Sequence, residues 1–221
     1  MDANKNMADN RSSLIDDLKI VYEMVDLSED DLEDSQIFLD GYMSAMRIQQ
    51  SRKSVARQIF TQKVAEFVTY YRFKYLFPQI TYPKVDFDGS LKTAFHLLID
   101  DLPIVVKACN MDTKVGAECS WLFQYQTEEN NECEEYIFGH DIDDKLIVCV
   151  FVHDMFSSGE IRGIIPLSEL IDRDLLQYYP KENIQNTKRC LYSTGLSYHG
   201  FGRLQPVHSS VVELFDEHDL V

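Results

Sequence analysis

Two titratable side chains lie in adjacent segments whose pattern is typical of one β-hairpin. The segment FHLLIDDLPIVVKA places His96 before, and Lys107 after, a turn at Asp100–Asp101. Neighbouring side chains of a strand point to opposite faces. A turn centred at this position therefore predicts that His96 lies across from Val105, with Lys107 on the same face as Val105.

This hairpin resembles the metal-binding strand pair of restriction-type nucleases of the PD-(D/E)XK superfamily. In those nucleases an Asp on one strand and a Glu-x-Lys on the next hold and assist Mg²⁺, which activates water and offsets the charge of the phosphate. An active member would read more like FDLLIDGLPIEVKA. Here Lys107 is in place, but His96 stands at the Asp position and Val105 at the Glu position. The resemblance thus makes His96 and Lys107 the candidate catalytic residues of a degenerate site. The resemblance, which covers roughly residues 40–175, implies a restriction-endonuclease-like fold with a degenerate site that has no metal ligands and needs no cofactor.

An active nuclease would need carboxylates from elsewhere in the chain. Asp86, Asp88 or Asp100 could serve together with Glu118, because some members of the superfamily move a carboxylate to a neighbouring element, and Gln124 could face the same site. The cofactor would then be Mg²⁺. A third interpretation stays open, because a strand such as IVVKA occurs in many α/β proteins: an interaction module of unrelated α/β fold.

A basic, helical segment precedes the hairpin. Residues 41–79 carry seven bases and only Glu66 as an acid, a net charge of +6, although the whole chain has a formal net charge of −16. Apolar residues keep a helical spacing from about Gln36 to Leu76, as one helix or as two that break near residues 51–54. The bases expected mainly outside that apolar stripe are Arg47, Arg52, Lys53, Arg57 and Lys63.

Four of these bases, Arg47, Arg52, Lys53 and Arg57, could share a helical face and meet DNA phosphates or an acidic partner. Alternatively, the acidic residues 26–34 could fold back and neutralise them, because residues 1–40 have a net charge of −9. A strongly acidic surface repels the phosphate backbone, so general nucleic-acid binding by the whole molecule is not expected. We expect a protein partner or a nucleoprotein complex, with DNA contacted only through the basic segment 41–79.

The elements that must position these residues follow from periodicity, and they predict an α/β (α+β) fold. N-terminal helices should be followed by a central mixed β-sheet of four or five strands with flanking helices. Residues 13–25 should form a helix, the acidic run 28–35 a solvated turn or helix start, and the chain from Tyr178 should be rich in loops. Strands are expected at 93–99, 103–109, 145–152 and 161–165, with a strand-like segment at 116–126 and a short helix at 167–171.

Composition favours one core domain with appendages. The expected division is a flexible N-terminus (1–12), a helical region packing on the core (13–79), an α/β nuclease-like core (80–205) and an acidic C-terminal tail (206–221). No apolar run approaches the roughly 18 residues that span a bilayer, and residues 1–13 lack the apolar stretch of a secretory signal. Five scattered cysteines without a CxxC pair favour reduced thiols. We therefore expect a soluble, intracellular (cytoplasmic) protein that acts by binding.

Overall fold

The chain folds as a mixed α+β structure in the computed structural model, which describes residues 23–48, 53–89, 96–100, 102–110, 121–128, 146–166, 177–180 and 189–196. Its helices in that part of the chain are α2 (Glu29–Ala45), α3 (Lys53–Phe73) and the short 3₁₀-helix η2 (Asp154–Phe156). The strands are β1 (Val25–Asp26), β2 (His96–Ile99), β3 (Leu102–Cys109), β4 (Trp121–Glu128), β5 (Leu146–Val152), β6 (Ser158–Pro166), β7 (Gln177–Pro180) and β8 (Arg189–Leu196).

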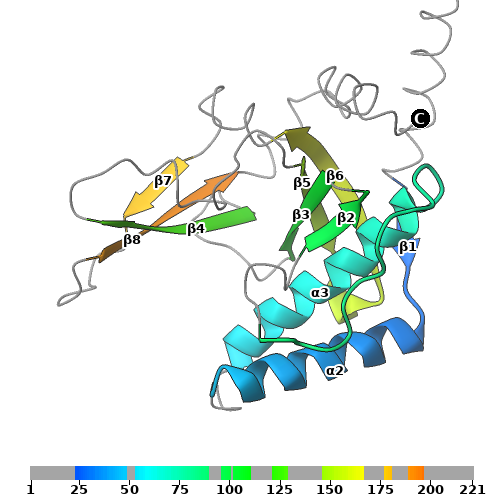
Figure 1. The fold of residues 1–221 in the computed structure, drawn as a ribbon, viewed down its shortest axis with the longest axis horizontal. Coiled ribbons are helices and arrows are strands. Elements are labelled where there is room, and N and C mark those ends of the chain that lie inside the picture. The colour runs from blue at the N-terminus through cyan, green and yellow to red at the C-terminus, as the bar shows by residue number, and fades with distance from the viewer. Residues whose placement is uncertain are drawn as a thin grey trace, which may run out of the picture.

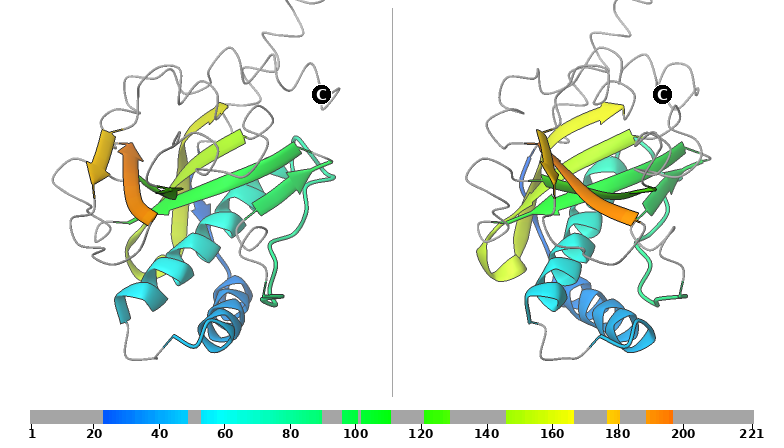
Figure 2. Two further views of the ribbon diagram at one scale, coloured as in Figure 1. Left: turned by 60° about the vertical axis from the view of Figure 1, so that its left-hand side comes forward. Right: turned by 90° about the vertical axis from the view of Figure 1, so that its left-hand side faces the viewer.

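A curled five-stranded mixed sheet forms the centre of the fold (Figures 1 and 2), in the order β1-β6-β5-β3-β2. β3 and β5 run parallel, and the other neighbouring pairs are antiparallel. The prediction of a central mixed sheet is confirmed. β5 has the composition of a strand covered on both faces, and all its residues except Phe151 are buried.

A second sheet contains three antiparallel strands in the order β4-β8-β7. The strand-like character of residues 116–126 is confirmed in β4, which begins at Trp121. The expectation of a loop-rich chain after Tyr178 is wrong for residues 189–196, which form β8. The strand pattern of RCLYSTGL is diluted by Ser, Thr and Gly, so pairing with β4 rather than local propensity decides its conformation.

The helices lie on the five-stranded sheet in two layers, with α3 against the strands and α2 on the outer side of α3 (Figure 1). Val64 and Val68 of α3 share an apolar core with alternate residues of the strands, among them Val106 and Val148. Phe38 of α2 belongs to a smaller cluster that joins the two helices. The helical region therefore packs on the sheet core, as the sequence predicts.

The start of α2 is fixed by its cap. Ser28 accepts a hydrogen bond from the backbone N–H of Asp31, and the Asp31 carboxylate accepts one from the backbone N–H of Ser28. The acidic run therefore begins the helix, one to two turns before the expected start at Gln36. The expected helix 13–25 is wrong at its last residue, because Val25 pairs with β6 in β1; its first ten residues lie outside the described part of the chain.

Two helices form rather than one continuous helix. α2 ends at Met46, and the following Arg47 adopts a positive φ of 52°. Arg47 is therefore in the turn and does not lie on the same helix as Lys53 and Arg57, contrary to the expectation of one shared helical face. Neither described α-helix has the apolar length that crossing a lipid bilayer requires.

Candidate functional site

The β2–β3 hairpin has the predicted register. His96 pairs with Val105 and Ile99 with Leu102 across a turn at residues 100–101, where Asp100 has a φ of 51°. Lys107 lies two residues beyond Val105 and thus on the same face of the sheet. The predicted alignment of His96, Val105 and Lys107 is confirmed at the level of the backbone, while the side chain of His96 lies outside the described residues.

Lys107 stands in apolar surroundings. Its partner in the parallel ladder is Cys149, and Val105 and Cys109 are its neighbours along β3 on the same face. Val105, Cys109 and Cys149 are all buried. Burial lowers the pKa of Lys107 to about 8, and the Cys149 thiol partly opposes that shift. Charge on the ammonium group is therefore less favourable here than in water.

The edge of β3 beside Lys107 is closed by α3. Within the described residues β2 pairs with β3 as far as Val105, and no described strand residue lies opposite Val106 and Ala108 on that side. The Gln62 amide fills this place, donating to the Val106 carbonyl at 2.6 Å and accepting from the Ala108 N–H at 3.1 Å. Asn110 adds a hydrogen bond to Thr61 at 3.2 Å. These contacts fix α3 beside the segment that carries Lys107.

The proposed replacement carboxylates have other partners. Asp88 accepts a hydrogen bond from Lys84 at 2.8 Å, and it follows Phe87, whose ring packs on α2. Asp100 is exposed in the hairpin turn and accepts a hydrogen bond from Gln79 at 3.1 Å. Glu118 and Gln124 are not among the residues with described side chains. Within the described side chains, no three His, Cys, Asp or Glu gather as metal ligands.

A second candidate site is the basic end of the α2–α3 hairpin, which we define by the exposed side chains of Arg47, Lys53 and Arg57. Arg57 also lies over the Phe156 ring of η2, 5.5 Å from its centre. Arg52 lies outside the described residues. Lys53 and Arg57 lie on the first turns of α3, and Arg47 directly follows the end of α2, so the three described bases do not all share one helix.

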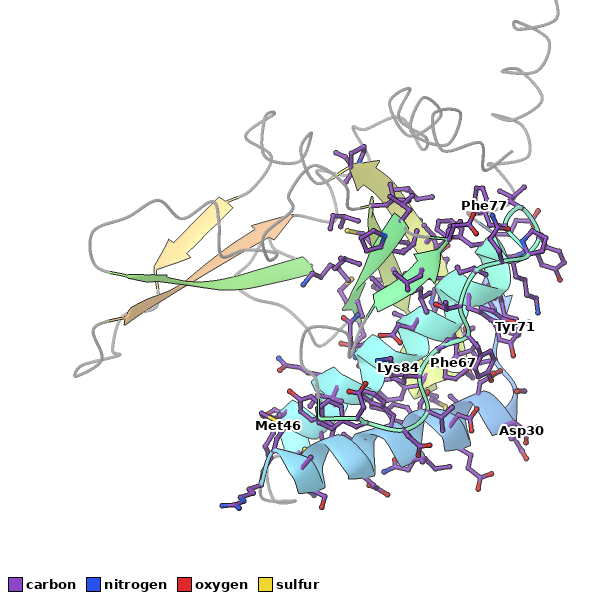
Figure 3. All side chains as sticks on the ribbon, in the orientation of Figure 1. Asp30, Met46, Phe67, Tyr71, Phe77 and Lys84 are labelled. Carbon is purple, nitrogen blue, oxygen red and sulfur yellow. The ribbon has the colours of Figure 1, made fainter. Side chains whose placement is uncertain are left out.

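The acidic residues in the first two turns of α2 lie at the opposite end of this helical hairpin, which we call the acidic end, whereas Asp40 lies at the basic end. Asp31 accepts a hydrogen bond from Tyr71 near the end of α3 at 2.7 Å. Glu23, before α2, pairs with Arg72 at 3.5 Å. In Figure 3, Asp30 and Tyr71 lie at one end of the helix pair and Met46 at the other. The described contact of residues 26–34 with α3 is therefore made at the end of the hairpin away from Arg47 and Lys53.

A pocket of about 420 Å³ opens at the basic end between α2 and α3. Leu39 and Met43 are buried at its base, and Ile48 and Ala56 add apolar surface. Its exposed charged lining residues are Asp40 and Arg47. Sequence reasoning did not predict this pocket, because it needs the two helices to meet at a definite angle.

A buried ion pair on α3 was also missed. Lys63, expected outside the apolar stripe, is completely buried and donates to Glu66 at 2.6 Å. The Lys63 ammonium lies 3.7 Å from the centre of the Phe38 ring. Burial raises the pKa of Glu66 to about 7, against the opposing effect of Lys63. The available signal was a lone acid three residues after a base within an otherwise apolar run.

Comparison with known proteins yields no relative for this chain. No protein-family model matches it, and neither a curated protein nor a solved structure is similar enough to count as a match. The chain's function must therefore be argued from its own residues.

Proposed function

We propose that this chain is a non-catalytic protein with a degenerate, restriction-endonuclease-like core, and that it acts by binding a protein partner or a nucleoprotein complex. The basic end of the α2–α3 hairpin would be its binding surface. Mg²⁺-dependent nuclease activity with displaced carboxylates is the alternative.

The observation that carries the proposal is the sheet face around Lys107. The hairpin register agrees with that of a nuclease strand pair, which supports the family resemblance. However, the position expected to hold the Glu ligand carries Val105, and the adjacent strand presents Cys149. Mg²⁺ binds through oxygen ligands. Among the described side chains on this face, the aliphatic Val105 and the Cys149 thiol offer no oxygen to such an ion.

The electrostatics of the helical hairpin support the binding role. Asp31 and Glu23 make their contacts at the acidic end, while Arg47 and Lys53 are exposed at the other end. A local positive surface on a chain of net charge −16 attracts acidic groups selectively, because the rest of the molecule repels them.

A cleavage assay tests the non-catalytic half of the proposal. The full chain would be incubated with supercoiled plasmid, duplex DNA, single-stranded DNA and RNA in Mg²⁺ or Mn²⁺, beside a Lys107→Ala variant and an EDTA control. We expect equal, background-level products in all samples. Cleavage that is lost both in EDTA and in Lys107→Ala would contradict the proposal. Loss of that cleavage in Asp88→Ala, Asp100→Ala or Glu118→Ala would then identify the displaced ligands.

Charge reversal tests the binding half. Chemical cross-linking in the producing cells would compare the wild-type chain with Arg47→Glu/Lys53→Glu. A Lys74→Glu/Arg162→Glu variant is the matched control, because it changes the net charge equally at other positions. We expect the cross-linked partner to be lost only in the first variant. Equal recovery with both variants would exclude the basic end as the binding surface.

A further inference from the structure

The pocket at the basic end combines an aliphatic floor with a positively charged edge. Its base is aliphatic, formed by the buried Leu39 and Met43, while the exposed Arg47 lies at its edge. A volume of about 420 Å³ lies within the range of roughly 300–1,000 Å³ typical of ligand pockets, near its lower limit. Such a space accepts one or two large apolar side chains.

The charges around the pocket define what can approach it. Lys53 and Arg57 are exposed on the first turns of α3, beside Ala56 of the pocket lining. Asp40 also lines the pocket and accepts a hydrogen bond from Gln36 at 2.9 Å. The basic side chains favour carboxylates of a ligand at the rim of the pocket. The aliphatic floor of the pocket requires an apolar group between those carboxylates.

A nucleic acid fits this surface less well. Proteins that bind single strands stack the bases on aromatic rings, whereas no aromatic residue among those described lines the pocket. Its lining residues are Gln36, Leu39, Asp40, Met43, Ser44, Arg47, Ile48 and Ala56. Duplex DNA presents phosphates without an apolar anchor, so it would leave the apolar part of the pocket unfilled.

We infer that the partner bound at the basic end is an acidic peptide segment that inserts a large apolar side chain into the α2–α3 pocket. This inference rests on the proposed function and specifies its partner. The inserted side chain supplies most of the binding energy, as buried anchors do at protein interfaces. Carboxylates on either side of it meet Arg47 and Lys53, and these pairs add selectivity and a faster association rate.

A displayed library of random peptides of about 12 residues, long enough for the three or four helical turns of a groove-binding segment, tests the inference. It would be selected on the full chain and counter-selected on Arg47→Glu/Lys53→Glu. We expect enriched peptides to carry Phe, Leu or Trp between Asp and Glu residues. Enrichment of sequences without that combination, or no enrichment, would overturn the inference.

Fluorescence anisotropy with an enriched peptide then locates the site. Ala56→Phe fills the pocket without changing charge, and Gln58→Phe is its control, because Gln58 is exposed on the same helix. We expect Ala56→Phe to weaken peptide binding at least about tenfold, which corresponds to about 1.4 kcal/mol, and Gln58→Phe to leave it unchanged. Circular dichroism would confirm that both variants are folded. Equal affinity for all three proteins would overturn the inference.

Binding of short duplex and single-stranded DNA, measured in the same assay, distinguishes a failure of the acidic-peptide inference from a failure of the proposed function. DNA binding that depends on Arg47 and Lys53 and exceeds peptide binding would overturn the acidic-peptide inference while supporting the proposed binding surface. EDTA-sensitive cleavage of that DNA would instead overturn the proposed function itself.

Discussion

At the scale of single residues, the side chain of Gln62 replaces a strand. The described pairing of β2 with β3 extends to Val105. Beyond it, the Gln62 amide hydrogen-bonds to the backbone groups of Val106 and Ala108 on β3. An amide carries both a donor and an acceptor, so one side chain can satisfy the two kinds of backbone group. An unpaired strand edge invites association with other chains. Gln62 therefore both anchors α3 and protects this edge.

Replacing Gln62 with Leu should destabilise the fold. The substitution leaves two partly buried backbone groups unpaired, and we expect a loss of about 1–3 kcal/mol in the free energy of unfolding. Urea denaturation followed by circular dichroism measures this quantity. Gln58→Leu, one turn earlier and exposed, is the control and should change stability by less than about 0.5 kcal/mol. Equal effects would show that the Gln62 hydrogen bonds contribute nothing.

Gly159 permits the close approach of α3 to β6. A Cβ at this position would lie 2.8 Å from a methyl carbon of Val68 and 3.1 Å from the Phe151 carbonyl oxygen. Gly159→Ala should therefore destabilise the protein by about 1–3 kcal/mol through overpacking. Gly41→Ala is the matched control, since its Cβ would meet Phe87 at an ordinary 3.5 Å and the residue is inside a helix. Thermal melting should show a higher Tm for Gly41→Ala than for Gly159→Ala. A higher Tm for Gly159→Ala than for Gly41→Ala would contradict the close packing at Gly159.

Lys107 gives a pH dependence whose sign follows from its lowered pKa. Its pKa is about 8 in the folded chain and near 10.5 when exposed, so the unfolded state binds more protons between these values. The contribution of Lys107 to stability should therefore rise as the pH increases from 8 to 10.5. Lys107→Met removes the penalty of the buried charge, and we expect this variant to be more stable than wild type at pH 7. The difference should shrink towards pH 10; a difference that is constant over this range would show that Lys107 titrates normally.

At the scale of elements, α3 is buried on two sides rather than along one apolar stripe. Ten of its residues are buried, because it packs on the sheet with one side and on α2 with the other. The Lys63–Glu66 pair lies on the side that faces Phe38 of α2. Burying two charges together avoids the larger penalty of burying one alone.

Substitution of this pair should be strongly non-additive. Glu66→Leu leaves the Lys63 charge buried and should cost about 3–5 kcal/mol, whereas Lys63→Met/Glu66→Leu should be neutral or stabilising. Because the pKa of Glu66 is raised from 4.5 to about 7, its contribution to stability falls as the pH rises from 4.5 through 7. Urea denaturation at pH 5 and pH 8 measures both effects, and the double variant should lose this pH dependence. Additive single and double effects would contradict coupling of the two residues.

At the scale of the whole molecule, the helical hairpin separates charge along its length. The contacts of Asp31 with Tyr71 and of Glu23 with Arg72 hold the acids at one end. The other end presents Arg47, Lys53 and Arg57 to solvent. Solvent screens exposed charges over about 8–10 Å at physiological ionic strength, so a partner at the basic end is little affected by the acidic end.

Asp40 is the acid at the pocket, and its removal should improve binding of acidic peptides. We expect Asp40→Asn to bind an acidic peptide a few-fold more tightly, mainly through a faster association rate, because a repulsive charge beside the pocket is lost. Asp30→Asn makes the same change at the acidic end and should leave affinity unaltered. Stopped-flow fluorescence at low and high salt measures the rates. Equal acceleration by both variants would indicate a general charge effect rather than a local one.

The sequence by itself determined the features that depend on neighbours along the chain. Alternation and a two-residue turn predicted the pairing of His96 with Val105, and the run after Ser28 contained the residues of a capping box. Strand composition predicted β2, β3, β5 and β6 of the central sheet, whereas β1 lies in a segment that was expected to be helical.

Only the tertiary structure decided the burial of Lys63, the strand conformation of residues 189–196, and the separation of the acidic and basic ends. Each depends on a partner distant in sequence or on another element: α2 for Lys63, β4 for β8, and α3 for the acids of α2. Local periodicity does not report which face of a helix a second helix will cover. The angle and register of helix packing determine which face is covered. They therefore also determine the shape of the pocket between α2 and α3 on which the proposed binding depends.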